Sequence, residues 1–228
     1  MRILNALASV LLLASPALAD DAKAVISVTG EGQVMVVPDM ATISLGVTVN
    51  GDTAKAALDA NSAALTTVLQ QLTAAGIEAK DIQTSGLSLG PVYDYSSSGG
   101  AQKVLGYSAS NIVTAHVRKI DNVGAVLDAS VTDGANVLNG ISFGLQDPVP
   151  ATDEARKKAV ADARRKAELY AAAAGMKLGG IISISEAGGM AMPMMMADAS
   201  FAKAGNVPVA GGELSVGASV SVTFALAD

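Results

Sequence analysis

The stretch Leu214-Ser-Val-Gly-Ala-Ser-Val-Ser-Val-Thr-Phe-Ala-Leu226 decides the fold, because apolar residues occupy every second position along it. This period of two is typical of a β-strand that buries one face and leaves the other face, here mainly Ser, Thr and Gly, outside the core. Residues 42–49 and 103–117 show the same alternation, and residues 25–37 and 82–93 are also strand-like. Long strands with one apolar face predict a mainly antiparallel sheet.

Three helices are expected between these strands, at about residues 53–75, 120–131 and 151–174. Asp52 and Thr152 are expected to cap the first and the third helix, which Gly76 and Gly175 should end. In the third helix alanine recurs at every fourth position, which makes a narrow, smooth ridge suited to close packing. The ridge consists of Ala155, Ala159, Ala163, Ala167 and Ala171.

These elements predict an α+β fold, a mainly antiparallel sheet with about three helices packed on one face. One sheet can hold both halves of the chain, so we expect a single elongated domain over residues 20–228. A loop rich in Met and Gly is expected within it at residues 188–212. The Ser/Thr face of the sheet would then meet solvent or another subunit.

The first 19 residues are typical of a signal peptide. Arg2 supplies a basic start, residues 4–14 are apolar, and residues 17–19 form an A-x-A cleavage site. The apolar run is far shorter than the roughly 20 residues that span a bilayer, and Pro16 interrupts it. The sequence therefore predicts export to the periplasm or the medium, cleavage after Ala19, and no integral membrane segment in the mature chain.

The composition excludes several kinds of chemistry. The chain has no Cys and one His, so it has no thiol nucleophile, no disulfide, no Cys-bound metal and no site with two imidazoles. Its formal net charge is −6 at pH 7 and only 3% of its residues are aromatic. Nucleic-acid binding is disfavoured, because such binding depends largely on Lys and Arg that neutralise phosphates.

Two local patterns are interpreted as structural rather than catalytic. Gly30-Glu31-Gly32 lacks the third glycine of a dinucleotide-binding loop, because position 35 is Met, and a strand follows it. A turn or bulge is therefore expected there. His116 could be a general base or a metal ligand, but no GxSxG motif accompanies it, and we interpret it as a residue on a strand surface. We predict no catalytic residues and no cofactor.

The most unusual segment contains five of the nine methionines within seven residues. Thioether sulfur binds Cu(I) and can be oxidised reversibly, so this segment is a candidate metal- or oxidant-binding site. The composition favours a flexible apolar loop that fills irregular gaps or contacts a partner, because no His or Cys accompanies the methionines. The residues concerned are Met190, Met192, Met194, Met195 and Met196.

Several stretches in one order along the chain resemble a known family. They are Ile26-Ser-Val-Thr-Gly-Glu-Gly-Gln-Val before Pro38-Asp39, Gly76-Ile-Glu-Ala-Lys-Asp-Ile, the run from Glu154 to Arg164, and Gly212-Glu-Leu-Ser-Val. Together they resemble the SIMPL-domain proteins of bacterial periplasms and outer membranes. The resemblance implies an envelope protein similar to outer-membrane immunogens and to proteins linked with oxidative-stress tolerance. It also implies homo-oligomers, in some relatives ring- or channel-like, and it brings no agreed catalytic residues.

The combined prediction is a non-enzymatic, exported cell-envelope protein that self-assembles into a homo-oligomer and has a role in oxidative or envelope stress tolerance. The alternative is a metal- or oxidant-binding module that acts through the Met-rich loop. The partner expected under the first hypothesis is a second copy of the chain.

We expect the mature protein to begin at Asp20, because signal peptidase cuts after the small residues of an A-x-A site. The measurement is the intact mass of the protein recovered from its native host. Recovery of the full-length chain embedded in membranes would contradict this prediction.

Overall fold

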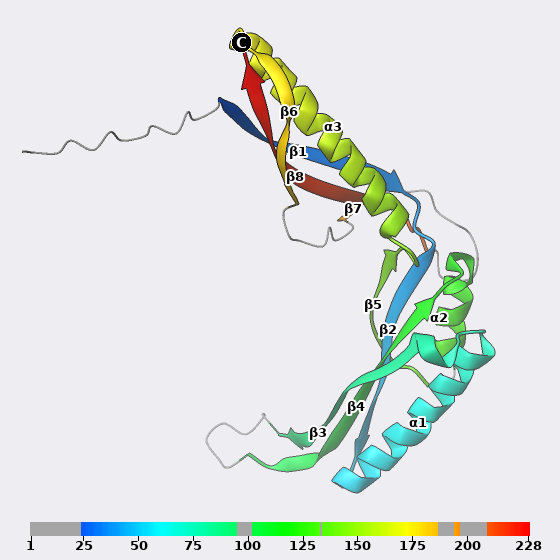
Figure 1. Cartoon of the computed structure of the whole chain (residues 1–228). Coiled ribbons are helices and arrows are strands. Elements are labelled where there is room, and N and C mark those ends of the chain that lie inside the picture. Colours follow the sequence, from blue (N-terminus) through cyan, green and yellow to red (C-terminus); the bar gives the residue numbers. More distant parts are fainter. Residues whose placement is uncertain (1–23, 95–101, 133, 187–193, 197–208) are drawn as a thin grey trace, which may run out of the picture.

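The computed structural model describes residues 24–94, 102–132, 134–186, 194–196 and 209–228. Within them the chain forms an elongated, curved molecule with two sheets, one near each end (Figure 1). The elements in chain order are β1 (Val25–Val36), β2 (Met40–Gly51), α1 (Ala54–Ala74), η1 (Ala79–Asp81), β3 (Ile82–Tyr93), β4 (Val104–Val117), η2 (Ile120–Asn122), α2 (Val123–Thr132), β5 (Val137–Gly144), α3 (Val149–Ala173), β6 (Lys177–Glu186), β7 (Met194–Met196) and β8 (Glu213–Ala227).

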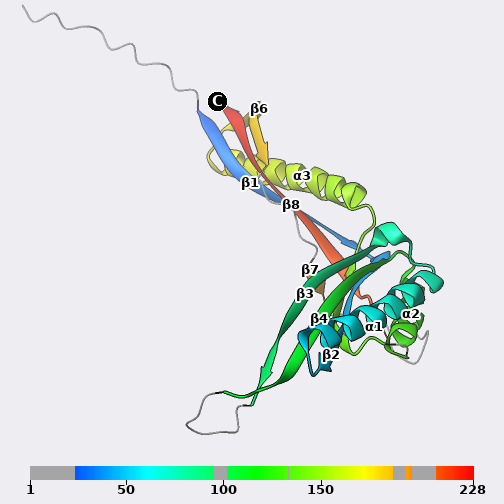
Figure 2. The ribbon, with the colours of Figure 1, turned by 90° about the horizontal axis from the view of Figure 1, so that it is seen from below.

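All strand pairs in the two sheets are antiparallel. The first sheet has the order β1-β8-β6, with β7 beside the start of β8, and the second has the order β3-β4-β2-β5. Helix α3 packs on the first sheet, and α1 and α2 pack on the second (Figure 2). The predicted α+β class, with mainly antiparallel strands and three helices, is confirmed.

The expectation that one sheet holds both halves of the chain is wrong. The chain turns at Pro38, and β1 and β2 then enter different sheets although three residues separate them. Strand β1 pairs with β8 from the other end of the sequence, whereas β2 pairs with β4 and β5. Alternation along a strand reports which face is buried but not which strand is the neighbour, so the sequence pattern could not separate the sheets.

The predicted helix ends are correct, and the predicted helix starts are each displaced. Gly76 and Gly175 follow α1 and α3 with φ of 88° and 72°, the left-handed conformation that stops a helix. Helix α1 is capped by Thr53 rather than Asp52, and the Thr53 hydroxyl accepts the N–H of Ala56. Helix α3 begins earlier than expected, so the Thr152 hydroxyl lies inside its first turn and donates to the carbonyl of Pro148.

The second sheet has the larger core. Alternate residues of β2 and β4 enter it from the sheet, and one face of α1 covers them together with α2. Its largest fully buried side chains include Ile43, Leu45 and Val47 of β2, Val113 and Val117 of β4, and Val68 and Leu72 of α1. This is the burial that the period of two and the helical period predicted.

The first sheet has a smaller core in which a helix contacts strand backbone directly. The alanine ridge of α3 is buried, as its spacing predicted. Beneath it lie Gly30 and Gly32, where an added Cβ would come within 2.0 Å of the carbonyl oxygens of Ala159 and Ala155. The predicted turn or bulge at these glycines is therefore wrong. Strand β1 runs through them unbroken, and they are needed because α3 leaves no room for a side chain.

We expect Gly30→Ala to lower the free energy of unfolding by about 3 kcal/mol or more, the upper end of the usual cost of overpacking. The added methyl group would collide with the backbone of α3, which cannot move aside as a flexible side chain could. Gly217→Ala is the matched control, since its Cβ would meet nothing closer than 3.7 Å in the same sheet. The measurement is the denaturant midpoint of unfolding. Equal midpoints for the two variants would show that α3 does not rest on β1.

Candidate functional site

The outer edge of β1 directs unpaired backbone groups away from its sheet. In an antiparallel pair, alternate residues bond the partner strand and the residues between them point to the other edge. The N–H of Leu226 donates to the carbonyl of Ala24 at 2.8 Å, which fixes this alternation. Thr29, Glu31 and Gln33 therefore point their backbone groups outward. An uncovered edge of this kind is a template for pairing with another chain.

Helix α3 covers this edge with three polar side chains that are four residues apart. Their spacing brings them to one side of the helix, next to the alanine ridge. The bonds are Lys158 Nζ to the Gln33 carbonyl (3.2 Å), the Glu31 N–H to Asp162 Oδ2 (3.1 Å) and Lys166 Nζ to the Thr29 carbonyl (2.9 Å). These three side chains thus bond the backbone groups with which a further strand would pair.

The charge state of Asp162 fits this role. Hydrogen bonds from Lys166, from the Glu31 N–H and from Arg165 hold the pKa of the Asp162 carboxyl well below its usual range. A carboxyl whose pKa is lowered by folding stabilises the folded state above its unfolded pKa, and loses that contribution only as the pH falls toward the folded value. The edge therefore stays covered through neutral and mildly acidic pH.

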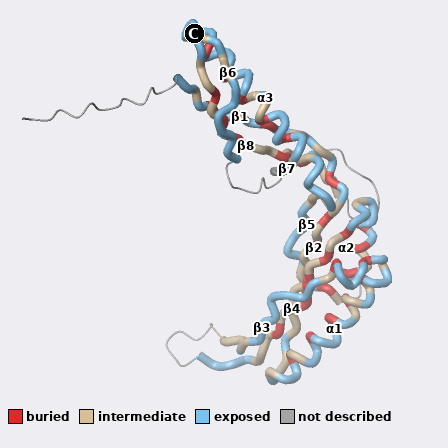
Figure 3. Tube along the Cα trace, viewed as in Figure 1, coloured by how far each residue is buried: buried red, intermediate tan, exposed pale blue. Residues whose placement is uncertain are grey.

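The outer edges of β3 and β6 differ from that of β1. Each strand pairs with one neighbour only, β3 with β4 and β6 with β8, among the residues that the structure describes. Most residues of both strands are exposed (Figure 3). Beyond the end of β2, strands β3 and β4 continue as a ribbon of two strands. These strands carry exposed leucine and isoleucine side chains, which makes them the candidate contact surfaces of the protein.

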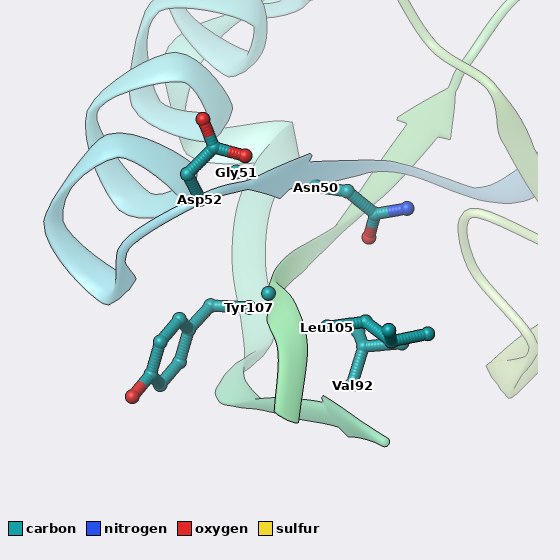
Figure 4. A pocket seen from close by; sticks show the side chains of 7 residues that line it. Asn50, Gly51, Asp52, Val92, Leu105 and Tyr107 are labelled. Carbon is teal, nitrogen blue, oxygen red and sulfur yellow. The ribbon is translucent and has the colours of Figure 1, made fainter. Parts of the chain in front are cut away.

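A hollow of about 250 Å³ lies where β2 ends and this ribbon begins (Figure 4). Its lining combines the Asp52 carboxylate and the Tyr107 side chain with the apolar Val92 and Leu105. The lining holds no His, Lys or Arg, so no cationic side chain of the lining faces this hollow.

His116 lies on the face of the second sheet that is opposite α1. Its neighbours Ala115 and Val117 are buried under the helices, and the imidazole Nδ1 lies 3.0 Å from the Thr42 hydroxyl. The position on a polar strand face is the one that the sequence predicted, although the residue is half-buried. Its hydroxyl neighbour is a cross-strand partner rather than a nucleophile on a strained turn.

The sequence pattern missed an ion pair at the junction of the two sheets. Arg118 Nε and Nη2 donate to Asp81 Oδ2 and Oδ1 at 2.6 and 2.7 Å, and the Asp81 side chain is only 6% exposed. Arg118 follows β4 and Asp81 precedes β3, so the pairing of these strands would have brought them together. Gln146 joins this pair to Asp39, since its side chain donates to the carbonyls of Arg118 and Asp39.

The Met-rich segment is described only in part. Met190 and Met192 lie outside the described residues, and Met194–Met196 form β7, which pairs with Glu213–Ser215 at the start of β8. This short strand lies within the stretch that was expected to be a loop. The Met-rich metal or oxidant site stays a prediction. Among the described residues, no three His, Asp or Glu side chains gather into a metal-binding group.

Over the same part of the chain, none of the helices has the length and apolar character needed to cross a bilayer.

Comparison with known proteins gives one family and several relatives. Residues 26–224 match the family model described as SIMPL, a protein of unknown function (DUF541). The chain is similar to the 26 kDa periplasmic immunogenic protein of Brucella melitensis, with 41% identity over 87% of this chain and 83% of that protein. It is also similar to the uncharacterized protein YggE of Escherichia coli, with 30% identity over 68% of this chain and 63% of that protein. These names denote no reaction.

We expect Asp81→Asn to lower the free energy of unfolding by about 1–3 kcal/mol. The substitution removes the buried carboxylate that bonds the Arg118 guanidinium. The bonds from Arg118 hold the pKa of Asp81 below its usual range, so this pair stabilises the wild type above about pH 4 and weakens as the pH falls. Melting curves from pH 7 to pH 2 test this. Asp121→Asn, at an exposed carboxylate, is the control. Parallel pH profiles for wild type and Asp81→Asn would contradict the assignment.

Proposed function

Because the chain belongs to the SIMPL family, we propose that it is an exported protein of the cell envelope that assembles into a homo-oligomer. In this proposal the signal peptide ends at Ala19 and the mature chain acts in the periplasm, where the name of its Brucella relative places that protein. The observation that carries the proposal is the set of exposed apolar residues on β3, β4 and β6. Apolar residues gathered on exposed strands are typical of a surface that another protein covers.

The proposed role is structural rather than catalytic. Three charged side chains have structural partners. Asp81 and Arg118 bond each other, and Asp162 bonds the edge of β1. The proposal includes a role in oxidative or envelope stress tolerance, which rests on the family resemblance. A metal- or oxidant-binding role of the Met-rich segment is the alternative, and its support is the clustering of five methionines.

We expect the mature protein to have a solution mass that is a multiple of its chain mass, as measured by light scattering over a range of concentrations. A variant in which Met190, Met192, Met194, Met195 and Met196 are replaced by Ser separates the two roles. If the segment contributes to assembly, the variant has a lower solution mass than the wild type. If it binds metal, titration with Cu(I) under reducing conditions gives binding to wild type and none to the variant. A wild-type monomer at every concentration would contradict the proposed function.

A further inference from the structure

Four of the six methionines that the structure describes lie on the two sides of the start of β8. Three of them form β7, which pairs with Glu213–Ser215 on one side of β8 (Figure 1). The fourth is Met35 near the end of β1, which pairs with Ser215 from the other side. Ser215 therefore lies between Met35 and Met194 in one row that crosses three strands.

This row lies on the face of the first sheet that is opposite α3. Gly32 of β1 faces the helix, so Met35, three residues further along the strand, faces away from it. Gln33 lies on the same face, and its side-chain amide donates to the Ser215 hydroxyl. Paired residues of neighbouring strands share a face, so register positions 35, 215 and 194 belong to one face. The Met35 side chain is 41% exposed, so an ion in solution can reach it.

The alternation along β7 adds one further methionine position to this face. Successive residues of a strand lie on opposite faces, so positions 194 and 196 share a face and position 195 belongs to the other. Met196 pairs with Glu213, whereas Met195 pairs with Leu214, which is fully buried. Positions 35, 194 and 196 are thus brought to one face although they come from distant parts of the sequence.

Small residues separate the two strands that carry these methionines. Neighbouring strands lie about 4.7–4.9 Å apart, so Met35 and Met194 are roughly 10 Å apart with only Ser215 between them. The next residue of β8 on the same face is Gly217, where an added Cβ would meet nothing closer than 3.7 Å. Methionine is long and unbranched with three rotatable bonds, so thioethers from the two strands can meet above Ser215.

The charge and the ligand types in these strands suit a soft cation. Strands β1, β7 and β8 contain two charged residues, Glu31 and Glu213, and both are acidic. Thioether sulfur selects soft ions such as Cu(I). The chain has no Cys and only one His, so it offers such an ion few ligands other than methionine.

We propose that Met35 joins Met194 and Met196 in a binding site for Cu(I). This inference rests on the metal-binding role given above as the alternative function, and it adds a ligand from β1 to the Met-rich segment. Bound Cu(I) then joins β7 to β1 across the start of β8. The proposal requires that position 195 is not a ligand, although it lies between two ligands in the sequence.

The test replaces single methionines by leucine in the mature protein, because this exchange conserves volume and costs little stability. A proposed ligand is removed by Met35→Leu, by Met194→Leu and by Met196→Leu. The matched controls are Met195→Leu, at the neighbouring position on the other face, and Met176→Leu, which follows α3. The measurement is the affinity for Cu(I) under reducing conditions, in competition with a chromogenic Cu(I) chelator.

We expect each of the three ligand variants to weaken Cu(I) binding by about tenfold or more, since even residues that only orient metal ligands contribute about 10–100-fold. Both controls should bind Cu(I) as the wild type does. A second readout on the wild-type protein is NMR of the methionine methyl groups during titration with Ag(I), a redox-stable substitute for Cu(I). The Met35 resonance should shift until one equivalent is added, and the Met176 resonance should stay unchanged.

Two results overturn the inference. If Met35→Leu binds Cu(I) like the wild type and the Met35 resonance does not respond to Ag(I), the metal site lies within the Met-rich segment alone, and the alternative function stands. If Met195→Leu or Met176→Leu weakens binding as much as Met35→Leu does, the ion does not select the face that the register defines. A wild type that binds neither Cu(I) nor Ag(I) removes the metal-binding role itself and leaves the proposed oligomer untouched.

Discussion

The packing of α3 directly on the backbone of β1 is the contact on which the first sheet depends. Gly30 and Gly32 leave the strand without side chains at two points, and the alanine ridge offers small side chains and carbonyl oxygens to fill them. This closeness has a second consequence. Because the helix axis lies so near the strand, the polar residues beside the ridge reach the outward backbone groups of β1. One helix thus supplies the core of the sheet and closes its edge.

The edge strands differ in whether polar side chains bond their outer edges, and this difference connects the fold with the proposed assembly. Strand β1 is closed by Lys158, Asp162 and Lys166. Among the described residues, the edge strands β3 and β5 and the middle of β6 carry no charged residue and expose leucine or isoleucine side chains. If every edge were open, strand pairing would be indiscriminate and would favour aggregation. Closing one edge with charged groups restricts association to the others.

The sequence predicted those features that depend on local periodicity, and it missed those that depend on distant pairing. The alternation in β2, β4 and β8 predicted their buried faces, and the spacing of alanine predicted the packed side of α3. The role of Gly30 and Gly32 was missed because a glycine in a strand reads as a bulge unless the facing helix is known. The Asp81–Arg118 pair was missed because it requires the register of β3 against β4. The division into two sheets requires the pairing of β1 with β8, about 190 residues apart. Of the candidate contact strands, β3 and β4 were predicted as strands, but their exposure follows from the same long-range pairing.

The most direct test of the closed edge is the hydrogen exchange rate of the Glu31 amide, measured by NMR in the full-length mature protein. Glu31 points away from β8, so an ordinary edge strand would leave its N–H open to water. The bond to Asp162 Oδ2 predicts that this amide exchanges as slowly as that of Gly30, which pairs with Val220 inside the sheet. Exchange of Glu31 at the rate of an unprotected amide, beside a slow Gly30, would show that α3 does not close the edge of β1.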